Sequence, residues 1–133
     1  MNGTSNESAP AAGATRLLVV DDNADAADTL ADLLRVLGYD VRCAADGASA
    51  MASLDSFVPQ LALLDIGLPG EDGYAVARRM RDDPRMAKAK LVALSGYGAD
   101  ANRSKTLGAH FDAHLVKPVS VDELIGLLEK MLG

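Results

Sequence analysis

Cysteine is nearly absent from this chain of 133 residues, and tryptophan is absent altogether. The single cysteine, Cys43, excludes an internal disulfide and a metal site of the CxxC type. Because it stands in the segment Val41-Arg42-Cys43-Ala44, we expect a small buried strand residue in a reducing compartment, and therefore a cytoplasmic protein. Long hydrophobic runs are missing too: no stretch of about eighteen consecutive apolar residues occurs, so the sequence predicts no membrane span.

The chain also has fewer basic than acidic residues. The chain has 13 Lys and Arg against 19 Asp and Glu, which gives a net charge of -6. This balance disfavours nucleic acid or an anionic membrane surface as a direct partner. We interpret the basic group between residues 78 and 90 as a solvated helix face. With 49% hydrophobic residues, the chain is long enough for one domain with a proper core and too short for two.

The first fifteen residues show no apolar periodicity and consist mostly of Asn, Ser, Thr, Gly, Ala and Pro. Such a composition cannot bury enough apolar surface to offset the cost of ordering a chain. It also lacks the charged start and apolar stretch of a signal peptide. We therefore expect a disordered tail or linker over residues 1–15 and a folded domain over residues 16–133.

Apolar runs and helical periodicities alternate along the rest of the chain. The sequence predicts strands over residues 16–20, 41–44, 61–64, 90–94 and 113–116. It predicts helices after Asp22 or Asn23 and ending at Gly38, over residues 47–55, over residues 73–81, weakly over about 100–107, and after a Ser120 cap. Five strands that alternate with helices favour an α/β fold in which a doubly wound parallel sheet carries helices on both faces.

The segment Leu61-Ala62-Leu63-Leu64-Asp65 is the centre of the predicted site. Four apolar residues followed by one carboxylate and a Gly-Pro-Gly loop indicate a buried parallel strand with Asp65 at its carboxyl end, where open α/β sheets bind ligands. The other predicted strands end in polar residues as well: Asp21 and Asp22 after the first, Ser95 and Gly96 after the fourth, and Lys117 after the fifth. Each could have a local role, such as a helix cap or a surface lysine, but their joint placement favours a site.

The carboxylates also select a strand order. Asp21, Asp22 and Asp65 can act together only if the first and third strands are neighbours, which the flavodoxin-like order 2-1-3-4-5 provides. Three adjacent carboxylates repel one another and favour a cation, and their hard oxygen atoms suit Mg²⁺. Asp65 could then attack phosphorus to form an aspartyl phosphate. Ser95 and Lys117 could contact phosphoryl oxygens, while Gly96 leaves the approach open.

With these residues in place, the chain resembles the receiver domains of two-component response regulators, including the chemotaxis receivers. The resemblance extends from about residue 16 to 132. It rests on four segments: Val19-Val20-Asp21-Asp22, Leu63-Leu64-Asp65-Ile66-Gly67-Leu68-Pro69-Gly70, Ala93-Leu94-Ser95-Gly96 and Leu115-Val116-Lys117-Pro118.

The resemblance implies a role for each residue of the site. Asp65 is the phosphoacceptor for a histidine kinase or a histidine phosphotransfer protein. Asp22, Asp65 and the Gly67 carbonyl bind Mg²⁺ directly, with Mn²⁺ as a substitute, and Asp21 holds a metal-bound water. Ser95, Gly96 and Lys117 face the phosphoryl group, and Lys117-Pro118 is a cis peptide. Such a domain is a phosphoacceptor rather than an enzyme, although it catalyses its own phosphorylation from small donors and its own dephosphorylation.

One departure concerns the switch that such domains contain. His114 stands where many receivers carry a Tyr or Phe that swings inward as the hydroxyl residue moves. We take Ser95 and His114 as the switch pair, acting on a partner surface formed by the helix over about 100–107, the strand over 113–116 and the last helix. The downstream partner is unknown. The chain is interpreted either as a stand-alone regulator without its own output domain or as the receiver part of a hybrid kinase.

Two alternatives from other classes stay open. The first is a hydrolase with an aspartyl-phosphate intermediate, similar to the haloacid dehalogenase-like phosphatases. Those enzymes need a second Asp two residues after the nucleophile, and here that residue is Gly67. The second is a receiver used only as an unphosphorylated interaction module. Its usual mark is loss of an acid or of the lysine, and this sequence retains Asp21, Asp22, Asp65 and Lys117.

Overall fold

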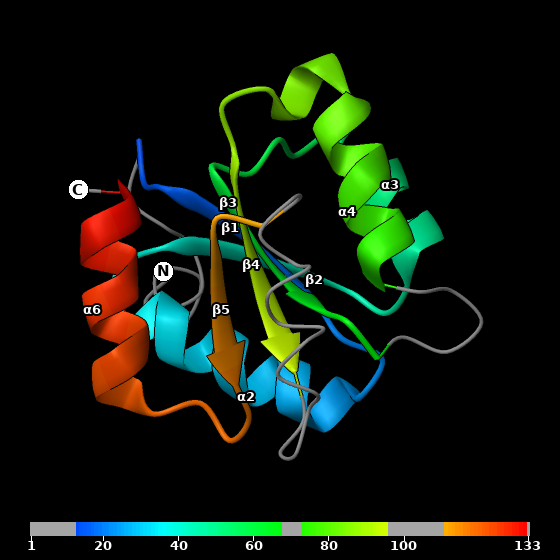
Figure 1. Cartoon of the computed structure of the whole chain (residues 1–133). Coiled ribbons are helices and arrows are strands. Elements are labelled where there is room, and N and C mark those ends of the chain that lie inside the picture. The colour runs from blue at the N-terminus through cyan, green and yellow to red at the C-terminus, as the bar shows by residue number, and fades with distance from the viewer. Residues whose placement is uncertain (1–12, 68–72, 96–110, 133) are drawn as a thin grey trace, which may run out of the picture.

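The computed structural model describes residues 13–67, 73–95 and 111–132 (Figure 1). The predicted Gly96 and the helix predicted over about 100–107 lie outside the described residues, as do residues 1–12 of the predicted tail. The described elements are β1 (Arg16–Val20), α2 (Ala24–Val36), β2 (Asp40–Ala44), α3 (Gly47–Ser53), β3 (Leu61–Asp65), α4 (Gly73–Asp82), the 3-10 turn η1 (Pro84–Met86), β4 (Lys90–Ser95), β5 (Ala113–Val116) and α6 (Val121–Leu132).

The five strands form one parallel sheet in the order β2-β1-β3-β4-β5, which confirms the predicted topology. Peptide hydrogen bonds continue past the carboxyl ends of the strands. Asp21 N donates to Ala44 O at 3.0 Å, Ile66 N to Leu94 O at 3.0 Å, and Lys117 N to Ser95 O at 2.7 Å. These bonds fix the backbone that carries the polar side chains beyond the sheet.

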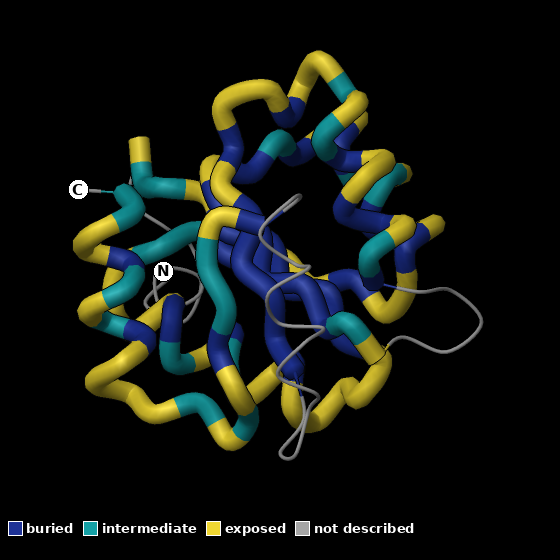
Figure 2. The backbone as a smooth tube through the Cα atoms, viewed as in Figure 1, coloured by how far each residue is buried: buried dark blue, intermediate teal, exposed yellow. Residues whose placement is uncertain are grey.

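Two helical layers cover the sheet. On one face, α2 and α6 pack against alternate residues of the strands such as Leu17, Val19 and Leu63. On the other face, α3 and α4 pack against Leu18, Leu64 and their neighbours (Figure 1). The central strand β3 is buried along its whole length, as the dark tubes at the middle of Figure 2 show. A Leu-to-Ala change in such a strand typically costs about 2–5 kcal/mol of stability.

Side-chain caps set the helix starts. Asn23, rather than Asp22, caps α2: its Oδ1 accepts a hydrogen bond from Ala26 N at 3.1 Å. Ser120 caps α6 as predicted, with Glu123 N donating to its Oγ at 3.4 Å. The segment after α2 turns at Gly38, whose φ of 100° is a conformation that favours glycine. None of the helices in the described ranges is long and apolar enough to cross a membrane.

The prediction that Cys43 is buried is wrong. The residue is exposed, with its Sγ 3.8 Å from the carbonyl oxygen of Ala27. Strand β2 lies at the edge of the sheet, and only Val41 and Ala44 of its residues are buried. An edge strand is incompletely covered by the helical layers, so a small apolar residue in it is not necessarily inside.

Candidate functional site

The carboxyl ends of three strands bring the predicted acids and lysine together. Asp21 follows β1, Asp65 ends β3, and Lys117 follows β5. Because β1 and β3 are neighbours in the sheet, one oxygen from each of Asp21, Asp22 and Asp65 lies within 4.8 Å of the other two. Asp21 and Asp65 are buried, whereas Asp22 is exposed.

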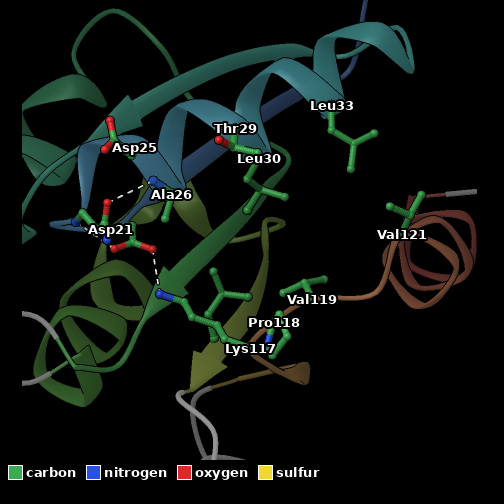
Figure 3. A pocket seen from close by; sticks show the side chains of 12 residues that line it. Asp21, Asp25, Ala26, Thr29, Leu30, Leu33, Lys117, Pro118, Val119 and Val121 are labelled. Atoms are coloured by element: carbon green, nitrogen blue, oxygen red, sulfur yellow. Dashed lines mark hydrogen bonds and ion pairs between the residues drawn. The ribbon is translucent and has the colours of Figure 1, made fainter.

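Lys117 reaches across the edge of the sheet to two of these carboxylates. Its Nζ donates to Asp21 Oδ2 at 2.7 Å (Figure 3) and to Asp65 Oδ2 at 3.2 Å. Partial burial alone would lower the pKa of Lys117, but the hydrogen bonds to Asp21 and Asp65, together with their charges, hold that pKa above its ordinary value. Lys117 is therefore a cation at neutral pH.

Backbone donors occupy the second oxygen of each buried carboxylate. Asn23 N donates to Asp21 Oδ1 at 3.0 Å, and Gly67 N donates to Asp65 Oδ1 at 2.8 Å. Asp22 has no hydrogen bond or ion pair with any residue that the structure describes. Of the three carboxylates, Asp22 is thus the one whose oxygen atoms are most accessible to a ligand from solvent.

The donor set fits a small, hard divalent cation. One ammonium group cannot balance three carboxylates, so the cluster keeps an excess of negative charge. All the potential ligands are oxygen atoms, which Mg²⁺ prefers, and an exposed carboxylate beside two oriented ones leaves room for water.

Ser95 and His114, the predicted switch pair, are joined by a hydrogen bond. The side chain of Ser95, at the end of β4, is fully buried, and its Oγ lies 2.7 Å from His114 Nε2 on β5. In the register of the two strands, His114 pairs with Ala93 and Ser95 with Val116, so both side chains lie on the same face of the sheet. The Lys117-Pro118 peptide is cis, as the resemblance implied.

Gly73 has a role at the site that the sequence did not reveal. A Cβ built on this first residue of α4 would overlap Ile66 Cα and lie 2.9 Å from Asp65 O. The start of α4 therefore lies directly against the backbone that carries Asp65, and only glycine fits. A Cβ on Gly67 would lie 3.5 Å from Asp65 Oδ1, which is an ordinary contact. A helix-initial glycine was the only signal available in the sequence.

A cavity of about 770 Å³ opens beside the Asp21–Lys117 pair, and it too was not predicted (Figure 3). One wall comes from α2 and the other from the connection between β5 and α6. The residues that line it are Asp21, Asn23, Asp25, Ala26, Thr29, Leu30, Leu33, Leu94, Lys117, Pro118, Val119 and Val121. The cavity is mainly apolar and has an ion pair at one end.

The arrangement suits nucleophilic chemistry on an anionic group. Asp65 provides a fixed carboxylate oxygen, and the Lys117 ammonium lies close enough to neutralise charge on an incoming group. The excess of carboxylates provides a place for a metal ion that would bind the same anion.

Comparisons with known proteins agree with this geometry. A family model described as the response regulator receiver domain matches residues 17–129. The DNA-binding dual master transcriptional regulator RpaA of Synechocystis is 32% identical over 117 residues, which cover 88% of this chain and 48% of the relative. The gliding motility regulatory protein of Myxococcus xanthus is 36% identical over 109 residues, which cover 82% of this chain and 14% of the relative. The chain thus spans half or less of these two proteins.

Among solved structures, the receiver domain of a sensor histidine kinase from Pseudomonas aeruginosa is similar over 91% of this chain and 99% of that one. The identity is 30% and the TM-score 0.81. That structure contains a magnesium ion coordinated in its active-site cleft.

Proposed function

Since this chain belongs to the response regulator receiver domain family, the receiver modules of two-component systems, we propose that it accepts a phosphoryl group on Asp65 from the phosphohistidine of a histidine kinase or phosphotransfer protein. The observation that carries the proposal is the convergence of Asp21, Asp22, Asp65 and Lys117 from three strands. Phosphoryl transfer needs mainly positioning and charge neutralisation, and these residues supply both.

In the proposed transfer, an oxygen of Asp65 attacks phosphorus. The bond between phosphorus and the donor's imidazole nitrogen breaks, and that nitrogen keeps the electron pair. Lys117 now donates to Asp65 Oδ2 and would transfer this contact to a phosphoryl oxygen. Gly67 N holds the other carboxylate oxygen and so fixes the orientation of the nucleophile. Gly96, which lies outside the described residues, is proposed to leave the phosphoryl approach open.

We propose that Mg²⁺ binds at Asp22, Asp65 and the Gly67 carbonyl, with Asp21 acting through a water molecule and Mn²⁺ as a substitute. When bound, the ion would offset the negative charge of the carboxylates and of the phosphoryl oxygens. One contact pattern supports Asp22 as a direct ligand: it has no described partner, whereas both oxygens of Asp21 and both oxygens of Asp65 already accept hydrogen bonds. The division between Asp21 and Asp65 rests on the resemblance to receiver domains. The magnesium site of the Pseudomonas receiver supports the choice of metal.

The output of the domain is proposed to be a surface rather than a reaction. Phosphorylation would draw Ser95 toward the phosphate and bring His114 inward with it, which changes β5, α6 and the segment over about 100–107 outside the described residues. A downstream protein would read this change. The domain would act in the cytoplasm as a phosphoacceptor that also accelerates its own phosphorylation and dephosphorylation.

A protein donor is proposed to dock over the apolar cavity beside Asp21 and Lys117, because this cavity adjoins the carboxylates that receive the phosphoryl group (Figure 3). Thr29→Lys would place a charged chain in the cavity. It should slow transfer from a phosphorylated histidine phosphotransfer protein while leaving labelling by acetyl phosphate unchanged. Val36→Lys is the matched control, since Val36 lies on the same helix, is 82% exposed and does not line the cavity. Equal transfer rates in the two variants would place the donor elsewhere.

Incubation with acetyl phosphate and Mg²⁺ tests the function itself. A receiver should take one phosphoryl group per chain, detected by intact mass, and should not turn over a phosphomonoester such as p-nitrophenyl phosphate repeatedly. Multiple turnover would instead indicate the hydrolase. Absence of both reactions would indicate an interaction module that is not phosphorylated.

A further inference from the structure

The Ser95 hydroxyl has a single described hydrogen-bond partner, the imidazole of His114. The Ser95 side chain is fully buried, and the separation between its Oγ and His114 Nε2 is 2.7 Å, a short hydrogen bond. His114 is half-buried on the neighbouring strand. A tyrosine or phenylalanine ring at this position could not place an N–H donor at the same point.

The chemistry of this pair allows two states. A serine hydroxyl has one hydrogen to donate and two lone pairs that accept, whereas a neutral imidazole nitrogen either donates or accepts. If Ser95 donates to His114, its lone pairs face any anion that arrives on the other side. If His114 Nε2–H donates to Ser95, the hydroxyl hydrogen is available to the anion. A phosphoryl group on Asp65 accepts hydrogen bonds and therefore selects the second state.

We propose that His114 is a positioning residue: its Nε2–H donates to Ser95 Oγ and directs the serine hydroxyl toward a phosphoryl oxygen on Asp65. The proposal rests on the proposed function. Hydrogen bonds in such a chain polarise one another, so the imidazole strengthens the donor that faces the phosphate. The same bond also ties His114 to Ser95, so that movement of the serine draws β5 with it. The coupling between phosphorylation of Asp65 and movement of β5 would then depend on a hydrogen-bond donor at residue 114. It would not depend on a ring that fills the space left by Ser95.

Coupling through an N–H donor at residue 114 and coupling through a ring that fills vacated space predict opposite results for two substitutions of His114. His114→Phe keeps a planar ring but removes the donor. His114→Gln removes the ring but can present an amide N–H near the position of Nε2. We expect the phosphorylation rate with acetyl phosphate to fall on the order of tenfold in His114→Phe, the effect of losing one hydrogen bond that acts on a charged group. His114→Gln should stay within about threefold of the wild type.

A double-mutant cycle with Ser95→Ala separates positioning from a general structural effect. Once the serine is absent, His114→Phe should cause little further loss, because both changes remove the same chain of hydrogen bonds. The Mg²⁺-induced rise in melting temperature should be the same in wild type and His114→Phe, which shows that the fold and the carboxylates are intact.

A spectroscopic measurement on the wild-type chain needs no variant. Nitrogen-15 NMR of the imidazole in the complex with Mg²⁺ and beryllium fluoride should show a proton on His114 Nε2. A proton on Nδ1 alone would overturn the proposal, as would wild-type labelling rates in His114→Phe together with slow labelling in His114→Gln. Those results leave Asp65 as the phosphoacceptor, whereas a wild-type chain that takes no label at all overturns the proposed function.

Discussion

Two clusters in the described part of the chain place one cation between two carboxylates, and they differ in where they lie. At the carboxyl edge of the sheet, Lys117 contacts Asp21 and Asp65 at 2.7 and 3.2 Å. On the surface near η1, Arg85 contacts Asp83 and Asp55, each at 2.8 Å. The side chains of Asp21 and Asp65 are 4% and 12% exposed. In the surface cluster, the side chain of Asp55 is 84% exposed and that of Asp83 is 12% exposed.

Two features separate the sheet-edge cluster from the surface cluster. Arg85 and Asp83 are two residues apart, and Asp83 caps the turn that contains Arg85, so that part of the surface cluster is local. Lys117 and Asp21 are 96 residues apart and meet only because the whole sheet forms. The sheet-edge cluster also contains Asp22, whose charge no described residue balances. Assembly from distant segments and uncompensated charge distinguish the sheet-edge cluster, whereas ion-pair geometry and the burial of a single carboxylate do not.

The two clusters should differ most in how much stability is lost when the cation of each, Lys117 or Arg85, is removed. Lys117→Met leaves two buried carboxylates without their cation. We expect the free energy of unfolding in the absence of Mg²⁺ to fall by about 1–3 kcal/mol, less than for a fully buried pair because the Lys117 side chain is 31% exposed. Arg85→Met removes a solvent-screened partner and should change stability only slightly. Urea unfolding of both variants measures the difference, and equal losses would remove the contrast between the clusters.

The second largest difference should be in the response of the melting temperature to Mg²⁺ when an acid of either cluster is replaced. At ten times its Kd, Mg²⁺ should stabilise the wild type by about 1.4 kcal/mol, which is roughly a 3 to 6 °C rise in melting temperature. Asp22→Asn should raise the melting temperature without Mg²⁺, because it relieves repulsion, and should lose most of the response to the metal. Asp55→Asn is the matched control from the surface cluster and should respond like the wild type. Thermal unfolding at constant ionic strength checks this, and equal wild-type midpoints with and without Mg²⁺ would contradict the proposed metal site.

A smaller effect concerns alkaline pH. Folding raises the pKa of Lys117 above its ordinary value of 10.5, so the stability that its charge provides is fully present below that pH and is lost as pH rises through the folded pKa. The stability difference between wild type and Lys117→Met should therefore be constant from neutral pH and shrink in alkali. The difference for Arg85→Met should not change, since its Asp83 partner holds the pKa of Arg85 even higher than usual. Urea titrations across this pH range test both expectations, and a constant difference for Lys117→Met would contradict the first.

Much of the fold could be predicted because its signals are local. Continuous apolar runs such as Leu61 to Leu64 predict buried parallel strands, and the turn residues between them predict helical crossovers. The strand order followed from requiring Asp21 and Asp65 to meet. The acids and Lys117 could be identified because each directly follows a strand, and parallel strands end at the same edge.

The details that were missed depend on contacts between distant residues. The exposure of Cys43 depends on how far the helices cover an edge strand, which its own sequence does not encode. The basic run was interpreted as a solvated helix face, but Arg81 in fact donates to Ala89 O at 3.0 Å and pairs with Asp112. The hydrogen bond between Ser95 and His114 and the close approach of Gly73 to Ile66 likewise required the assembled strands and helix.

Phosphorylation of Asp65 is tested most directly with one acid from each cluster. Wild type, Asp65→Asn and Asp55→Asn are incubated with acetyl phosphate and Mg²⁺ and analysed by intact mass, with circular dichroism to show that each is folded. We expect one phosphoryl group on the wild type and on Asp55→Asn, and none on Asp65→Asn. A phosphoryl group on folded Asp65→Asn at the wild-type rate would contradict the claim that Asp65 is the phosphoacceptor.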